Sequence, residues 1–380
     1  MNRPGGRVAK LVTVAEKQAF PWVPGSATGI GSMPGDNPLE AARTIAGELP
    51  DFPHLAELPA RGPGADMTGR TAGLLVDIAV EITTRGWRIA DRPGRDLRRA
   101  KSLLAADLDA MEETLDGYEG PLKVQITGPW TLAATLEQPH SLKVALADPG
   151  LVADLAASLA EGVAAHVAEV TKRVPKAALV VQLDEPALPA VADGAVPTPS
   201  GLSRVRAVED EILRDRLRTV LAVAGGYTVV HCCAPGYPFG TVTGAGADAV
   251  SFDMSLLKLS DYDELAAAAE AGRGLFAGAV PVLPASVPGP SGPGPSGPGQ
   301  GVPRDRRSGG PEQTRTTATD TAKSIAELWR RMAQPPANCA PQVVVTPACG
   351  LAGVSPERAL AVLRRVRETA AILPEMMGEL

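Results

Sequence analysis

The sequence has few aromatic residues, few cysteines and few histidines. Aromatic residues make up 3% of the 380 positions, so the core must be built mainly from Ala, Val and Leu within a hydrophobic fraction of 44%. Four cysteines in so long a chain do not make a disulfide framework. This usage is typical of a reducing compartment, and we expect a cytoplasmic protein.

Long apolar runs and excess positive charge are also missing. No stretch of 18 or more apolar residues occurs, so we expect no membrane span. Residues 1–17 are basic but lack the apolar segment of a secretory signal. The net charge of −6 disfavours nucleic acid and anionic membranes as partners, which leaves a small molecule as the expected one.

Eight short apolar runs are spread along the chain, and helical sequence follows most of them. They lie near residues 28, 55, 124, 180, 229, 250, 277 and 344. Continuous apolar runs are typical of strands that are covered on both faces. Eight such units in a chain of this length predict a single (β/α)8 TIM barrel, an α/β fold, over residues 21–380. A doubly wound open sheet is the alternative.

Two segments depart from this alternation. Residues 1–20 show neither a strand nor a helix pattern, so we expect a flexible N-terminal arm. Residues 283–312 interleave proline with glycine and serine, a composition that buries too little apolar surface to offset the entropy lost on ordering. We therefore expect a disordered surface insertion that interrupts the barrel and has no function of its own.

The strongest functional signal follows the β-branched run at 228–230, where His231, Cys232 and Cys233 stand together. Imidazole and thiolate ligands at the end of a buried strand indicate a transition-metal site, most often zinc. The alternative is that the two cysteines are small core residues, since free cysteine is often buried and inert.

Two further candidate ligands also follow apolar runs. Asp253 ends the run at 249–252, and Cys349 comes directly after the run at 343–347. In a barrel such positions converge on one mouth, where enzymes of this fold keep their active sites. An ordinary acid that caps a loop is the rival interpretation of Asp253.

Three other strand ends carry residues suited to a ligand. Asp184 and Glu185 are adjacent acids before Pro186, and an acid there can hold a substrate ammonium group; a helix-capping pair is the alternative. The glycines of Gly29-Ile30-Gly31-Ser32 let a ligand approach the backbone, or simply make a tight turn. Trp130, after Thr127-Gly128-Pro129, presents its ring to a ligand or packs in the core.

These motifs, in this order, resemble a known family, the C-terminal catalytic barrel of cobalamin-independent methionine synthase. That barrel is a zinc methyltransferase related to the uroporphyrinogen decarboxylase barrels. The resemblance runs from about residue 27 to the C-terminus, interrupted by the Pro/Gly insertion. The motifs that carry it are Ile30-Gly31-Ser32, Thr127-Gly128-Pro129, Asp184-Glu185-Pro186-Ala187, His231-Cys232-Cys233 and Pro347-Ala348-Cys349-Gly350-Leu351.

The resemblance implies transfer of a methyl group to the thiol of homocysteine, which forms methionine. The family's zinc ligands carry over to His231, Cys233, Asp253 and Cys349, with Asp in place of the family's Glu and Cys232 in a variable position. The homocysteine contacts carry over to Ile30, Gly31, Ser32 and Asp184. A further family glutamate that holds the substrate amine matches Glu57. Asp184 is thus the expected catalytic residue.

The sequence departs from the family where the methyl donor binds. Thr135 and Ala190 stand where a tryptophan and a glutamate contact folate, and the proton-donating histidine is missing from Gly278-Ala279-Val280-Pro281. We also expect no second barrel in a chain of this length. The donor is therefore either methyltetrahydrofolate or a methyl-corrinoid, free or on a corrinoid carrier protein. A uroporphyrinogen decarboxylase-like enzyme and a non-catalytic barrel with structural zinc remain alternatives.

Overall fold

The computed structural model describes residues 20–282 and 317–379. The arm expected at 1–20, apart from Phe20, and the insertion expected at 283–312 therefore lie outside the described residues.

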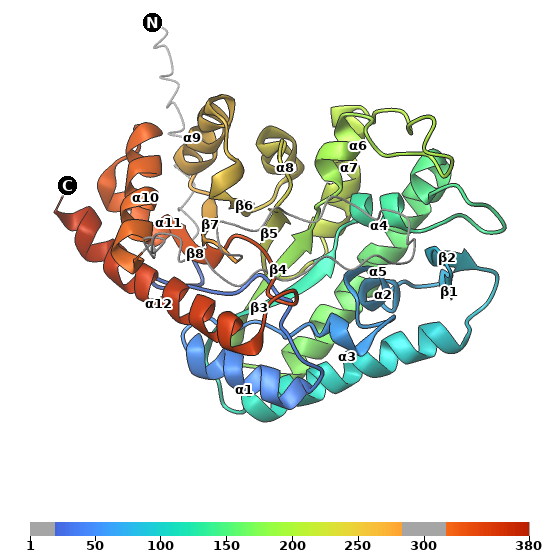
Figure 1. Cartoon of the computed structure of the whole chain (residues 1–380), viewed down its shortest axis with the longest axis horizontal. Coiled ribbons are helices and arrows are strands. Elements are labelled where there is room, and N and C mark those ends of the chain that lie inside the picture. The colour runs from blue at the N-terminus through green and yellow to red at the C-terminus, as the bar shows by residue number, and fades with distance from the viewer. Residues whose placement is uncertain (1–19, 283–316, 380) are drawn as a thin grey trace, which may run out of the picture.

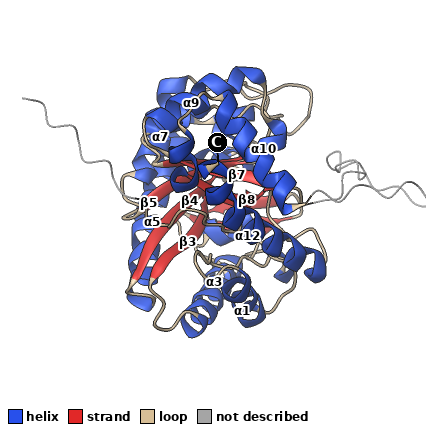
Figure 2. Cartoon of the chain, turned by 90° about the vertical axis from the view of Figure 1, so that its left-hand side faces the viewer, coloured by secondary structure: helices blue, strands red, loops and turns tan. Residues whose placement is uncertain are grey.

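A curled parallel sheet of six strands lies at the centre of the molecule, with helices packed around it (Figures 1 and 2). Its strands are almost entirely buried, as the apolar runs predict for strands covered on both faces. In sheet order they are β3 (Gly120–Thr127), β4 (Ala177–Asp184), β5 (Tyr227–Cys232), β6 (Ala249–Asp253), β7 (Gly274–Val280) and β8 (Val343–Pro347).

The regular strands expected near residues 28 and 55 are not formed, which corrects the count of eight. Each of these segments makes only isolated parallel bridges: Ala27 with Val345 on β8, His54 with Lys123 on β3, and Ser32 with Glu57. The first segment carries glycines and the second follows Pro53, residue types that weaken a regular ladder. The described fold is thus an α/β fold whose six-stranded sheet has two extended segments bridged to its edges.

Within the described residues, α-helices follow most of the strands, as the sequence predicts. Asn37 caps the first, since its Oδ1 accepts hydrogen bonds from Leu39 and Glu40 N–H. The helices are α1 (Pro38–Glu48), α2 (Met67–Ala72), α3 (Arg95–Thr114), α4 (Pro129–Thr135), α5 (Pro149–Arg173), α6 (Leu188–Ala192), α7 (Asp210–Leu221), α8 (Phe239–Ala245), α9 (Tyr262–Glu270), α10 (Ala318–Arg331), α11 (Cys339–Gln342) and α12 (Pro356–Gly378).

A hairpin that the sequence analysis missed lies between α2 and α3. Strands β1 (Ala79–Thr83) and β2 (Gly86–Ala90) pair in antiparallel register. Their alternation of apolar and polar residues is the usual signal of a half-buried strand. Continuous apolar runs, which predict the strands of the parallel sheet, are absent from this segment.

Helix α5 is long and apolar enough to cross a membrane by length and composition alone, and it is the one such helix among the described residues. Its inner face is instead part of the protein core, with Leu155, Leu159, Val163 and Val167 all buried. It therefore has the character of a core helix.

The scarce aromatic residues gather where the strands begin. Trp22 packs edge-on against Tyr227 at a centroid distance of 4.9 Å and against Phe276 at 5.2 Å, and it stacks on Phe52 at 6.0 Å. Tyr227 is the first residue of β5, and a Cβ on Gly274, the first residue of β7, would touch the Trp22 ring. This cluster fills the amino ends of the strands, so functional side chains are left to the carboxyl ends.

Candidate active site at the carboxyl ends of the strands

The parallel register brings the predicted site residues to one edge of the sheet. Asp184 at the end of β4 pairs with His231 on β5, and His231 pairs with Ser251 on β6. Asp253 pairs with Gly278 on β7, whose last residue is opposite Pro347 on β8, two residues before Cys349. The carboxyl ends of adjacent parallel strands meet at one edge, as the sequence analysis expects.

Two of the four predicted metal ligands are in contact, although they are far apart in the chain. The Sγ atoms of Cys233 and Cys349 lie 3.4 Å apart and share a hydrogen bond. This bond lowers the pKa of the Cys349 thiol to about 7 and raises that of Cys233. Cys349 is exposed, whereas Cys232 and Cys339 are buried elsewhere as small core residues.

His231 offers one ring nitrogen for a ligand. Its Nδ1 lies 2.9 Å from the Ser251 hydroxyl, while its buried Nε2 has no hydrogen-bond partner among the described residues. Burial lowers the pKa of His231 to about 3, so the ring is neutral. A neutral imidazole that is oriented through one nitrogen and bare at the other is the usual form of a metal ligand.

Asp253 caps a loop. Its Oδ1 accepts hydrogen bonds from the Ser255 N–H at 2.8 Å and from the Ser255 hydroxyl at 2.7 Å. Within residues 20–282 and 317–379, no group of three or more His, Cys, Asp or Glu side chains is gathered closely enough to hold a metal ion. The structure thus brings Cys233 to Cys349, and the ligand role of Asp253 stays a prediction.

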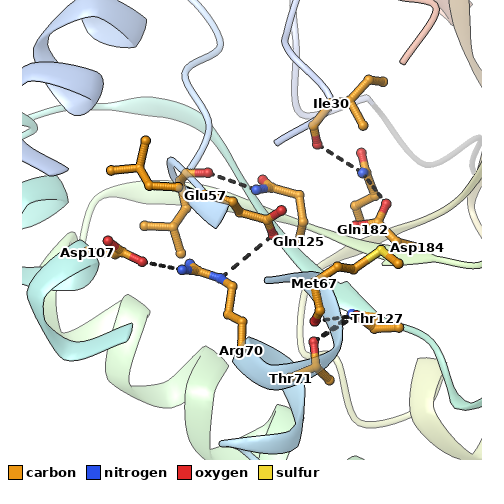
Figure 3. Close-up of polar contacts among 12 residues, drawn as sticks. Ile30, Glu57, Met67, Arg70, Thr71, Asp107, Gln125, Thr127, Gln182 and Asp184 are labelled. Atoms are coloured by element: carbon orange, nitrogen blue, oxygen red, sulfur yellow. Dashed lines mark hydrogen bonds and ion pairs between the residues drawn. The ribbon is translucent and has the colours of Figure 1, made fainter. Parts of the chain in front are cut away.

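The predicted substrate segment is held from inside the sheet by two side chains that the sequence analysis missed. Lys123 Nζ donates to the Ile30 carbonyl at 2.7 Å, and Gln182 Nε2 donates to the same oxygen at 3.0 Å. Gln182 also donates to Asp184 Oδ1 at 2.7 Å (Figure 3). One amide therefore fixes the Ile30 backbone and the Asp184 carboxylate relative to each other.

The glycines of this segment make room for protein side chains. A Cβ on Gly29 would lie 2.2 Å from the His54 ring, and one on Gly31 would lie 2.7 Å from Gln125 Nε2. These contacts explain why glycine is needed at both positions without a ligand, and the approach of a ligand to this backbone stays a prediction. Ser32 joins the segment to the last motif, because its carbonyl accepts from Leu351 N–H at 2.8 Å.

Glu57 belongs to a buried ionic network. Its Oε1 lies 3.7 Å from Arg70 Nε, and Arg70 also pairs with Asp107 on α3 (Figure 3). Asp107 in turn accepts from Arg61 at 2.6 Å. Burial raises the pKa of Glu57, and the Arg70 charge opposes that rise. The network thus fixes the carboxylate of Glu57, whose backbone pairs with that of Ser32.

Two carboxylates and one amine share the buried interior. Burial raises the pKa of Asp184 well above its ordinary value, and the nearby Glu57 charge adds to the rise. Burial lowers the pKa of Lys123 to about 7, against the attraction of Asp184 and Glu57. Glu57 also pairs with the buried Arg70, so Asp184, which forms no ion pair within residues 20–282 and 317–379, is the acid that can take one further positive group.

A sequence signal for these interior residues exists. Lys123, Gln125 and Thr127 alternate with apolar residues along β3, and Gln182 and Asp184 do the same along β4. Because side chains alternate between the two faces of a strand, polar residues at every second position share a face. Ser251, two residues before Asp253, follows the same rule.

The adjacent acids Asp184 and Glu185 have different roles. Glu185 is fully buried and accepts hydrogen bonds from Trp130 N–H at 2.9 Å and from Thr131 N–H at 2.7 Å, which caps α4. The capping alternative is therefore correct for Glu185. The Trp130 ring is buried and donates to the Leu213 carbonyl at 3.0 Å, so the packed alternative is correct for it.

The positions that depart from the family hold no acidic or basic side chain. Thr135 ends α4, and its hydroxyl donates to the Thr131 carbonyl at 2.7 Å. Ala190 lies in α6 and packs against the core. Gly278 on β7 packs closely against β6. A Cβ atom at this position would lie 2.5 Å from the Phe252 carbonyl oxygen, so no side chain fits there.

A protein-family model described as "Cobalamin-independent synthase, Catalytic domain" matches residues 25–291. The chain belongs to this family. It is therefore a methyltransferase that acts on homocysteine in methionine synthesis, as the resemblance predicts, and not a decarboxylase. The matched range contains His231, Cys233 and Asp253, while Cys349 lies beyond it and joins the site through its contact with Cys233.

A solved structure of similar fold is that of a B12-independent methionine synthase from Shewanella sp. W3-18-1 in complex with selenomethionine. The two chains are 13% identical with a TM-score of 0.59, and the match covers 94% of this chain and 100% of that one. At this identity the likeness shows a shared fold. No curated protein matches the chain.

Proposed function

We propose that this methyltransferase holds a zinc ion at His231, Cys233 and Cys349, with Asp253 as the fourth ligand, and methylates homocysteine beside it. Two observations carry the proposal: the Cys233 and Cys349 thiols are in contact, and His231, two residues before Cys233, has a buried Nε2 without a hydrogen-bond partner among the described residues. Two sulfur ligands at about 2.3 Å from one tetrahedral zinc lie roughly 3.7 Å apart, close to the 3.4 Å between Cys233 and Cys349.

The remaining ligand is compatible with this donor set. All described hydrogen bonds of the Asp253 carboxylate use Oδ1, so Oδ2 is the oxygen available to a metal. Nitrogen, oxygen and sulfur donors in this ratio suit zinc. When bound, zinc supplies a Lewis acid that lowers the pKa of a substrate thiol, so that the thiolate exists at neutral pH.

The chain's own residues hold the amino acid part of homocysteine. Asp184 forms no ion pair within the described residues, whereas Glu57 already pairs with the buried Arg70. Asp184 therefore binds the substrate ammonium group, and the nearby Glu57 charge adds to the attraction. Gln182 fixes Asp184, and the Ile30-Gly31-Ser32 backbone lines the other side. The substrate sulfur then displaces the donor from the methyl carbon, a step in which positioning supplies much of the rate.

The donor we propose is a methyl-corrinoid, free or on a carrier protein. A folate donor leaves as an amine that needs a proton, yet Gly278-Ala279-Val280-Pro281 offers no acid. Thr135 and Ala190 offer no charged contact to folate either. A corrinoid leaves as a reduced metal centre and needs no proton, whereas loss of a general acid costs roughly 10²–10⁴ in rate.

Side-by-side initial rates of methionine formation test this function. Zinc-loaded protein is given homocysteine with either methylcobalamin or methyltetrahydrofolate at matched concentration. We expect the faster rate with methylcobalamin and, with either donor, loss of activity in Cys349→Ser but not in Cys339→Ser. Efficient turnover with methyltetrahydrofolate would overturn the donor proposal, and undiminished activity of Cys349→Ser would overturn the site.

We also propose a barrel architecture and a cellular location for the enzyme. The bridged segments 27–32 and 54–57 take the places of the first two strands of a (β/α)8 barrel between β8 and β3. We propose a cytoplasmic enzyme without nucleic-acid or membrane partners, in line with its acidic charge and its four free thiols.

A further inference from the structure

A large groove lies on the flank of the molecule, outside the set of residues assigned to homocysteine and zinc. Its volume is about 960 Å³, and its walls come from the segment 141–149, the segment 198–209 and the first turns of α7. Trp130, Leu146 and Val152 form part of its buried apolar floor. Small-molecule sites typically have volumes of about 300–1,000 Å³ and mostly apolar walls, so the groove has the size and character of one.

The charged side chains at the groove are mostly basic. Lys143, Arg204, Arg206 and Arg216 line it, against Glu209 as the one acidic lining residue. Within the described residues neither Lys143 nor Arg206 forms an ion pair. Arg216 pairs with Asp215 at 2.8 Å, while its buried Nε has no hydrogen-bond partner among them. The protein as a whole is acidic, so this local excess of positive charge complements an anion.

Exposed apolar side chains gather at the same place. Six large hydrophobic side chains are exposed in the described part of the chain; Leu142 (53%) and Ile212 (46%) line the groove. A third, Leu202 (92%), lies in the segment that forms one wall. Exposed apolar residues scattered singly need no explanation, but several around one concave surface mark a binding site.

We propose that this groove binds an anionic small molecule with an apolar ring system. The rings lie against Leu142, Val152 and Ile212, and the carboxylate, sulfonate or phosphate groups pair with Lys143 and Arg206 at the rim. An uncharged ligand would leave the basic rim unused, and a simple inorganic anion would leave the apolar floor unfilled.

The groove is separate from the homocysteine site. None of the residues assigned to homocysteine or to zinc lines the groove. Homocysteine should therefore not compete for the groove.

Fluorescence titration with 8-anilinonaphthalene-1-sulfonate, an anionic aromatic probe, tests the proposal on the full chain. We expect saturable binding that Lys143→Glu/Arg206→Glu weakens at least 10-fold. Arg98→Glu/Lys101→Glu, the same charge reversal on exposed positions of α3, should leave it unchanged. Ile212→Ser removes apolar area from the wall without changing any charge, and it should also weaken binding. N-phenyl-1-naphthylamine, which lacks the sulfonate, should bind more weakly than the anionic probe.

The negative outcomes are equally definite. Absence of saturable binding, or equal affinity in the groove variants and the α3 control, would overturn the proposal. Displacement of the probe by homocysteine would show that it occupies the interior instead. Matching unfolding temperatures and methionine-forming activity confirm that each variant is folded. These outcomes are independent of the zinc and donor proposals, because the probe titration needs neither.

Discussion

At the scale of single residues, the interior owes its character to polar side chains placed in otherwise apolar strands. Lys123 is fully buried, and its burial is tolerated because Ile30 and Gln125 accept its hydrogen bonds and two carboxylates lie near it. Burying a lysine amine costs free energy, so we expect Lys123 to position another group of the protein. Here it holds the Ile30 backbone, which we propose faces the substrate.

Lys123→Met should keep the aliphatic packing while removing the hydrogen bond to the Ile30 carbonyl. Hydrogen bonds to charged groups contribute about 1.5–3 kcal/mol, so we expect the KM for homocysteine to rise roughly 10- to 100-fold. The zinc content should stay unchanged, and kcat should fall less than KM rises. Steady-state kinetics measure this split, with Lys101→Met on the exposed face of α3 as control. An unchanged KM would show that Lys123 only fills space.

Asp253 combines a visible capping role with a proposed ligand role, and two substitutions separate them. If Oδ2 is a zinc ligand, Asp253→Ala should weaken zinc binding, while Asp253→Glu, which restores the family's residue, should retain zinc and activity. Competition with a chelator measures the affinities. Equal zinc affinity in the wild type and in Asp253→Ala would leave Asp253 with the loop cap alone.

At the scale of elements, the alternation of side chains along a strand explains why the adjacent acids Asp184 and Glu185 have different contacts. Asp184 faces the interior, and Glu185, on the opposite side, caps α4 through the N–H groups of Trp130 and Thr131. The buried Glu185 carboxyl meets no buried cation in its described contacts, and burial raises its pKa to about 7. The helix cap is therefore sensitive to pH.

The sign of that sensitivity follows from linkage. Because the folded-state pKa of Glu185 is raised from 4.5 to about 7, its contribution to stability is complete below pH 4.5 and is lost as the pH rises through 7. Glu185→Gln removes this titration. The unfolding free energy of the wild type relative to the variant should fall by about 3 kcal/mol from acidic to slightly alkaline pH. Urea unfolding across that range measures it, and a constant difference would contradict the raised pKa.

How far the sequence predicts the elements depends on the kind of signal. Continuous apolar runs predict β3 to β8. The segments near 28 and 55 carry only local apolar character, and their bridges depend on partners on β8 and β3 that no local pattern reveals. Likewise, Cys349 is found by its motif, but its contact with Cys233 follows from the register of four strands.

At the scale of the whole molecule, the candidate site combines residues from both sides of the Pro/Gly-rich insertion. Val280 ends β7 and Thr317 caps α10, and the Pro/Gly-rich segment lies between them, outside the described residues. Ala348 N–H donates to the Val280 carbonyl at 2.9 Å, so the Cys349 loop is anchored to β7 without that segment.

Deleting residues 285–312 and joining the ends with a short Gly/Ser linker should change the unfolding temperature and the zinc content little. Loop-closure entropy varies slowly with length, so shortening a loop with the disorder that its Pro/Gly composition predicts changes stability by about 1 kcal/mol or less. Thermal unfolding and metal analysis of the deletion variant check this. A large loss in either would show that the segment packs on the sheet or supports the Cys349 loop.

The central claim, a zinc ion that takes the homocysteine thiol beside Cys233 and Cys349, is tested most directly by X-ray absorption at the zinc edge. We predict two sulfur neighbours at about 2.3 Å in the zinc-loaded protein and three after homocysteine is added. Cys349→Ser should lose one sulfur neighbour in both states, and Cys339→Ser should match the wild type. A sulfur count that homocysteine leaves unchanged, or a shell of nitrogen and oxygen alone, would contradict the account.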